Sequence, residues 1–154
     1  MNKIVQSVGF MTAVFAVFGI ALGVLSFISG SWAQSQLITE AGGATEFGPV
    51  FIAITYLQTA IVIFLLGPVI AALTASVFGS QFGRPKLALV TGGAASLVGF
   101  YLMSVIALAF LVLSKGADAH QAFSFTQALL PMLAAGIPTA IMGSVLSALS
   151  SALN

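Results

Sequence analysis

The chain has 154 residues and a formal net charge of +1; 60% of its residues are hydrophobic and only 5% are charged. Soluble domains carry about 25% charged residues, so the composition excludes an ordinary soluble protein and predicts a single membrane domain over residues 1–154. The few Lys and Arg residues exclude nucleic-acid binding, and the absence of cysteine excludes disulfides and thiolate chemistry.

Charged residues divide the chain into four long uncharged stretches. Crossing a hydrocarbon core of about 30 Å takes about 20 helical residues, and each stretch is long enough. We therefore expect an all-α integral membrane protein whose four transmembrane helices form a helical-hairpin bundle. The expected spans are about 8–29, 50–78, 87–113 and 126–149.

The first span, 8–29, follows Lys3 and precedes Ser31, Trp32 and Ala33. This arrangement resembles a secretory signal with a cleavage site. The apolar run is longer than a signal core of about 7–15 residues, so we expect the segment to be retained and to span the membrane. Trp32 then lies at the outer end of the span, where its ring favours the headgroup layer.

The second span, 50–78, has about 29 residues and is too long for a perpendicular crossing, so it is expected to tilt, kink or emerge from the bilayer. Pro68 in this span and Pro138 in the last one each remove a backbone donor and predict a local bend. Neighbouring helices commonly satisfy the freed carbonyls in membranes. We therefore interpret both prolines as structural bends rather than as hinges of a gate.

The short loop 79–86 contains Arg84 and Lys86, half of the Lys and Arg residues of the chain. Such residues accumulate in cytoplasmic loops, and Lys3 is two spans away on the same side. The loops 30–49 and 114–125 contain Glu40, Glu46 and Asp118 with one lysine. We therefore expect both termini and the 79–86 loop to be cytoplasmic, with Lys3, Arg84, Lys86 and Trp32 as topology anchors.

The third span, 87–113, contains Tyr101, which lies about 21 Å from Leu87 at ~1.5 Å per residue. Its hydroxyl group needs a partner at this depth. An ordinary hydrogen bond between helices is a better interpretation than substrate binding.

Small residues recur at every fourth position in the first, second and last spans. Such faces allow helices in lipid to approach closely, and we expect the second and fourth spans to pack through them. Internal packing is the preferred interpretation, and an interface between subunits stays open. The expected helix-packing residues are Gly19, Gly23, Gly67, Ala71, Ala75, Gly79, Gly136, Ala140, Gly143, Ser144, Ser147 and Ala148.

The spans contain no Asp, Glu, Lys, Arg or His residue. Proton-coupled carriers need an ionisable group at this depth, and a serine nucleophile needs a base within reach. The single histidine, His120, is close in sequence only to Asp118, which is too few ligands for a metal site. We therefore expect no catalytic residue, no metal and no cofactor.

The expected function is a non-enzymatic structural or accessory subunit of a larger membrane assembly, or a self-assembling component of a membrane or envelope. Its partners would be membrane lipid and either further copies of the chain or other membrane subunits. The alternative is a small oligomeric channel or neutral-solute transporter that uses hydroxyls and backbone carbonyls. A membrane enzyme remains possible only if partners or bound cofactors supply the missing groups.

Overall fold

The computed structural model describes residues 3–41, 44–115 and 125–153, and side chains over 4–32, 53–113 and 130–153. Every described residue except Gly83 and Arg84 lies in a helix. The elements are α1 (Lys3–Ala41), α2 (Ala44–Phe78), the short 3-10 helix η1 (Gly79–Phe82), α3 (Pro85–Lys115) and α5 (Phe125–Leu153).

Four of these helices are long and apolar enough to cross a membrane, which confirms the predicted all-α class and the number of apolar helices. The apolar segments are Ile4–Trp32, Ala53–Phe82, Pro85–Leu113 and Leu130–Leu153. Each of the four expected spans falls largely within one of them.

The helices α1 and α2 are longer than expected and continue through most of the expected loop 30–49. The predicted boundaries of each span were placed where its apolar run ends. Residues 33–41 include Ala, Gln, Leu and Glu, which are favourable in helices, so α1 continues beyond its apolar part. The expected loop 114–125 falls mostly on residues 116–124, which lie outside the described residues.

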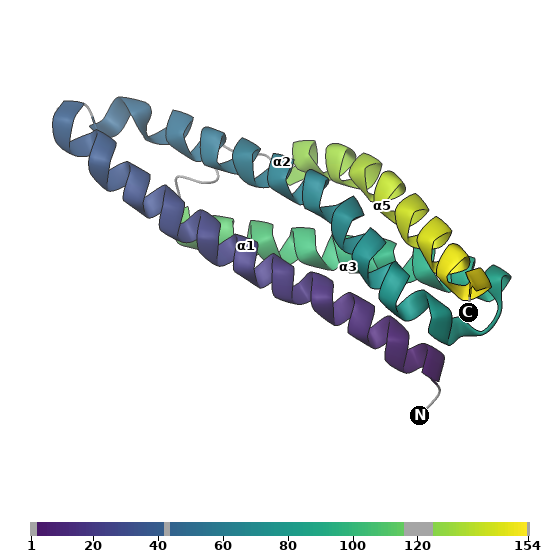
Figure 1. Ribbon diagram of the computed structural model, residues 1–154. Helices are drawn as coiled ribbons and strands as arrows, with labels where there is room; N and C mark the ends of the chain where they lie inside the picture. The colour runs from purple at the N-terminus through teal and green to yellow at the C-terminus, as the bar shows by residue number, and fades with distance from the viewer. Residues whose placement is uncertain (1–2, 42–43, 116–124, 154) are drawn as a thin grey trace.

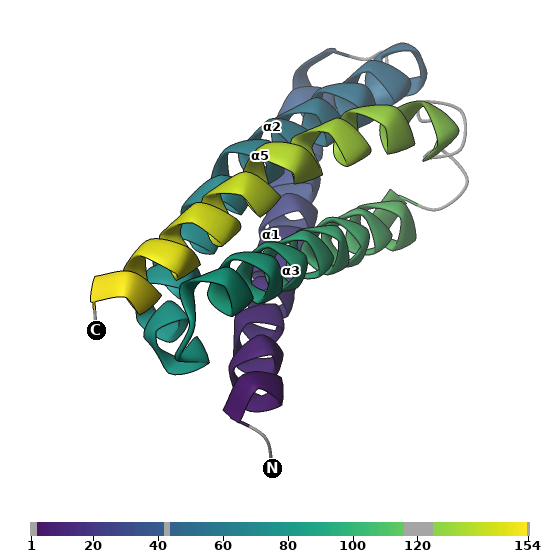
Figure 2. The same ribbon diagram turned by 90° about the vertical axis from the view of Figure 1, so that its right-hand side faces the viewer.

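Both termini and η1 lie at one end of the molecule, and α1 meets α2 at the other end (Figures 1 and 2). The most extensive contacts of α3 are with α5 and α1, and those of α2 are also with α5 and α1. The contact between α2 and α3 is smaller. Neighbours around the molecule therefore follow the order α1, α2, α5 and α3.

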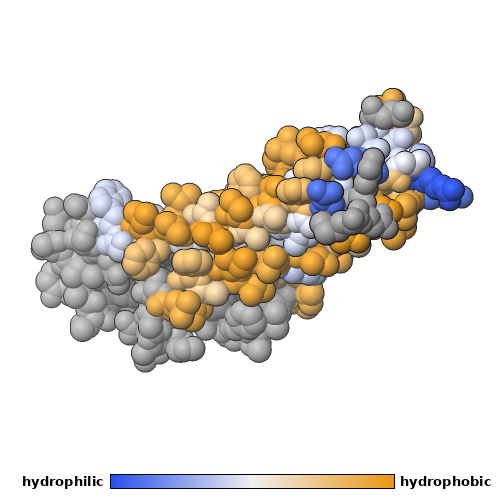
Figure 3. Space-filling model, turned by 90° about the horizontal axis from the view of Figure 1, so that it is seen from below, coloured by the Kyte–Doolittle hydropathy of each residue, from blue (hydrophilic) through white to orange (hydrophobic). Residues whose placement is uncertain are grey.

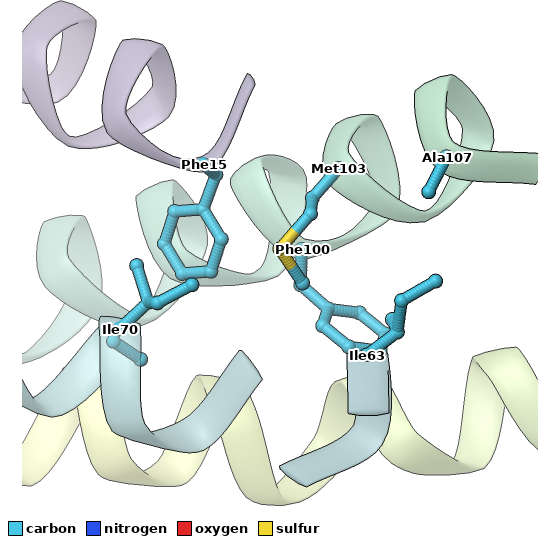
Figure 4. Packing of buried hydrophobic residues seen from close by; sticks show 7 residues of the cluster. Phe15, Ile63, Ile70, Phe100, Met103 and Ala107 are labelled. Atoms are coloured by element: carbon cyan, nitrogen blue, oxygen red, sulfur yellow. The ribbon is translucent and has the colours of Figure 1, made fainter. Parts of the chain in front are cut away.

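Large apolar side chains fill the space between the helices (Figure 4). Phe15 of α1 and Phe100 and Met103 of α3 are fully buried, and they cluster with Ile63 and Ile70 of α2. A second cluster contains Met11, Ala75, Phe82, Ala88 and Ala95. The interior of these four helices is thus closed by packed side chains, most of them apolar.

The outer surface is also apolar. Large hydrophobic side chains are exposed within residues 5–32 of α1, 54–77 of α2, 87–113 of α3 and 130–153 of α5. At ~1.5 Å per residue, these segments are about 35 to 40 Å long, comparable with a hydrocarbon core of about 30 Å and its interfacial layers. Strongly hydrophilic residues gather at the right-hand end of Figure 3, where the termini lie.

The connection between α2 and α3 turns sharply after η1. Gly83 has a positive φ of 68°, a conformation that glycine adopts without strain from a Cβ atom. Pro85 is the first residue of α3, and the amide of Ala88 donates to the carbonyl of Arg84 at 2.9 Å. A proline at the first helical position has no amide to leave unsatisfied, so the sequence starts α3 at this point.

Candidate functional site

A close approach between helices is built from glycine and serine where α3 packs on α5. A Cβ atom added at Gly92 would lie 2.5 Å from Cβ of Ser147 and 2.8 Å from the carbonyl oxygen of Gly143. A Cβ atom added at Gly143 would lie 2.6 Å from Cβ of Ser96 and 2.9 Å from the carbonyl oxygen of Gly92. Neither glycine can gain a side chain without a shift of the opposing backbone.

This contact is reciprocal. Gly92 precedes Ser96 by four residues on α3, and Gly143 precedes Ser147 by four residues on α5. Each serine packs on the glycine of the other helix, and the carbonyl of each glycine faces the Cα of the other. Cα–H···O contacts of this kind recur at helix interfaces. We call these four residues the glycine-serine contact; Gly93, which faces Ser144, extends it.

The two serine hydroxyls of the glycine-serine contact are buried without a partner. Ser96 and Ser147 are both 0% exposed, and the hydroxyl group of neither forms a hydrogen bond. The hydroxyl of Ser151, one turn further along α5, is unpaired as well. A buried polar group without a partner costs about 1–3 kcal/mol, so small size rather than hydrogen bonding accounts for serine at these positions.

The expected packing residues of α1 lie against α3. A Cβ atom added at Gly19 would lie 2.8 Å from the carbonyl oxygen of Met103, and one at Gly23 would lie 2.7 Å from Cβ of Phe110. From the other side, Gly99 of α3 accommodates the ring of Phe15. The close contact of α1 is therefore with α3.

The expected packing residues of the second span, Gly79 of η1 included, lie against α3 and α5. Gly67 faces the ring of Phe100 and, at 2.9 Å from the position of a Cβ atom, the hydroxyl oxygen of Thr139. Gly79 faces the backbone of Ser147. Ala71 and Ala75, between these two glycines, are fully buried. The second and fourth expected spans do contact each other, but the glycine-serine contact of α5 is with α3.

The remaining expected residues of α5 follow one another at four-residue spacing along one face of the helix. Gly136 is buried against Tyr101, whose hydroxyl donates to the carbonyl of Leu133 at 3.3 Å. Tyr101 therefore bonds to a neighbouring helix. Three other positions are partly buried: Ala140, Ser144 and Ala148.

Three further side-chain hydrogen bonds join helices. The hydroxyls of Ser26 and Thr59 are 2.8 Å apart and join α1 to α2. Ser7 donates to Oε1 of Gln81 at 2.7 Å, and Ser150 donates to the carbonyl of Ser76 at 2.9 Å. Every buried polar side chain among the described residues is serine or threonine.

The topology anchors lie at the ends of the apolar segments or just outside them. Arg84 and Lys86 are exposed beside η1, and Trp32 is 66% exposed at the end of the first apolar segment. Lys3 is the first residue of α1. His120 and Asp118 lie outside the described residues, and no group of three His, Cys, Asp or Glu side chains occurs among those described.

An open groove of about 280 Å³ lies between α1 and α3, lined by Val24, Phe27, Phe110 and Leu113. Its lining is apolar, and it lacks the convergent polar groups that orient a small-molecule ligand. Comparison of the chain with protein-family models, curated proteins and solved structures finds no match.

Proposed function

We propose that the chain is a multi-pass integral membrane protein, a helical-hairpin bundle with both termini in the cytoplasm, and that it is a non-enzymatic structural or accessory subunit of a membrane assembly. The observation that supports the membrane placement is the exposed apolar surface on all four long helices. In water, a monomer seldom exposes an apolar patch of more than a few hundred Å². In lipid, the same surface needs no partner.

The orientation is supported by the charges at the two ends. Lys3, Arg84 and Lys86 belong to the end that holds η1 and the termini. Glu40 belongs to the last turn of α1 and Glu46 to the first turn of α2, at the opposite end of the molecule. Cationic loops remain on the cytoplasmic side, so the end with η1 would face the cytoplasm.

A structural role is supported by the absence of chemistry in the described interior. Its buried polar groups are hydroxyls, and several of them are already bonded, as Ser26 is to Thr59 of a neighbouring helix and as Thr74 and Ser104 are to carbonyls of their own helices. The small-residue faces contact other helices of the same chain. A partner subunit would therefore dock on the outer apolar surface, and membrane lipid would cover the rest.

Cross-linking in intact membranes, followed by detergent extraction and mass measurement, tests the assembly. We expect a defined complex of the chain with copies of itself or with other membrane subunits. A chain that remains a cross-linking-resistant monomer without a partner would refute the subunit proposal.

The alternative channel is tested by reconstitution into liposomes. The centre of the four helices is closed by Phe15, Phe100 and Met103, so a pore would have to lie between subunits. We expect no flux of water, small neutral solutes or common ions above that of empty liposomes. Flux that depends on the protein would favour the channel instead.

A further inference from the structure

We propose that Arg84 and Lys86, at the start of α3, bind the phosphate headgroup of an anionic phospholipid. This inference rests on the proposed membrane placement, which puts this end of the molecule at the surface of the bilayer. It adds a specific lipid class to the general contact with the membrane.

The first argument is charge. The side chains of Arg84 and Lys86 are exposed, and Lys3 begins α1 at the same end. None of the residues whose side chains are described is acidic. Glu40 and Glu46 belong to the opposite end of α1 and α2, about 50 Å away along helices of this length. An anionic group from outside the chain is the complement to these cations.

The second argument is rigidity. The bond from Ser7 to Gln81 ties η1 to α1, and Gly79 packs on the backbone of Ser147 in α5. The two cationic residues follow directly and are separated by Pro85. Because the backbone of this segment is already held between two helices, it loses little conformational entropy when a ligand binds. More of the interaction energy then contributes to affinity. The guanidinium of Arg84 can donate two parallel hydrogen bonds to phosphate oxygens.

The third argument distinguishes a lipid from a free phosphate. Directly after the cations, α3 exposes Leu87, Leu89 and Val90, the last of them 66% exposed. A phospholipid can place its headgroup on Arg84 and Lys86 and its acyl chains on this apolar surface. A soluble anion would gain only the electrostatic part.

The purified full chain in neutral detergent is mixed with equimolar phosphatidylglycerol and phosphatidylcholine. The lipids that remain bound to the protein after purification are then measured. Wild type should be enriched in phosphatidylglycerol. Arg84→Gln and Lys86→Gln should each lower this enrichment about fivefold, which corresponds to about 1 kcal/mol per cation near anionic lipid. Lys115→Gln, the same change at the other end of α3, should leave the enrichment unchanged, and Arg84→Lys should retain most of it.

The double variant, which combines Arg84→Gln and Lys86→Gln, must keep the helical content and monodispersity of wild type, measured by circular dichroism and size exclusion. Salt titration of wild type gives a second measurement that needs no variant, and it should release phosphatidylglycerol selectively. Equal enrichment in wild type and the double variant, or no effect of salt, would overturn the site. Displacement by millimolar inorganic phosphate would instead identify a free-anion site. A chain that does not insert into liposomes would overturn the membrane placement itself.

Discussion

At the scale of single residues, the glycines differ sharply in what surrounds them. Gly92 and Gly143 face backbone and serine atoms of the opposite helix, whereas a Cβ atom at Gly9 would have nothing within 4 Å. The same substitution at these positions therefore separates steric conflict from helix propensity. Alanine is intrinsically more favourable than glycine in a helix by about 1 kcal/mol.

We expect Gly92→Ala and Gly143→Ala each to destabilise the protein by about 1–3 kcal/mol, because the added methyl forces the helices apart. Gly9→Ala should leave stability unchanged or raise it slightly. Thermal unfolding in detergent, followed by circular dichroism, measures all three. Equal behaviour of the buried and exposed sites would contradict the glycine-serine contact.

The unpaired hydroxyls predict an opposite effect. Ser96→Ala and Ser147→Ala remove buried polar groups that have no hydrogen bond, so stability should be unchanged or increase. Ser26→Ala removes a bond to Thr59 and should cost about 0.6 kcal/mol, the usual value for a polar contact between membrane helices. A loss of stability in both serine variants of the glycine-serine contact would mean that their hydroxyls are bonded after all.

At the scale of secondary-structure elements, the turn between α2 and α3 depends on one backbone conformation. Gly83 has a φ of 68°, which costs other residues about 1 kcal/mol or more. Gly83→Ala should therefore lower the free energy of unfolding by about that amount. Gly83→Asn should lower it less, because asparagine tolerates the left-handed region. Equal losses in the two variants, measured by thermal unfolding, would argue against strain at this turn.

The sequence allowed the helices to be found but not their ends or their partners. Charge-free apolar runs identified all four helices, because a helix satisfies all of its backbone hydrogen bonds internally when it lies in lipid. The end of α1 was missed because favourable helix formers extend beyond its apolar run. The start of α2 at Ala44 was missed because Gly48 and Pro49 argue against helix there. A Gly-Gly pair in the third span, Gly92 and Gly93, gave no prediction of packing. Ala88, Gly92 and Ser96 are small residues at four-residue spacing, and that signal was available.

Which helix packs against which depends on the side chains of all four helices together, and the sequence of one helix does not determine it. The small stripes of the second and fourth spans were expected to meet each other, and Gly67 and Gly79 do face α5, but the glycine-serine contact joins α5 to α3. On α3 the small residues Ala88, Gly92 and Ser96 are followed by the large residues Phe100 and Met103. The stripe of small residues on α3 therefore covers only three positions. Those large side chains fill the centre, where only a structure shows which helix they contact.

At the scale of the whole molecule, the distribution of charge predicts the orientation. The chain has no cysteine, so single cysteines report accessibility without background. Gln6→Cys and Gln34→Cys place thiols towards opposite ends of α1. With an impermeant maleimide, Gln34→Cys should react in intact cells, and Gln6→Cys should react only after permeabilisation. The reverse pattern would invert the proposed topology.

The reciprocal fit of α3 and α5 predicts how the protein behaves when the chain is expressed as two separate fragments. Because each helix carries both a recess and the group that fills it, the two surfaces recognise one another without the peptide link between them. Separately expressed fragments 1–115 and 125–154 should therefore reassemble in the bilayer and co-purify. Gly143→Leu in the shorter fragment should abolish this complementation, while Leu149→Ala, at an exposed position of the same helix, should preserve it.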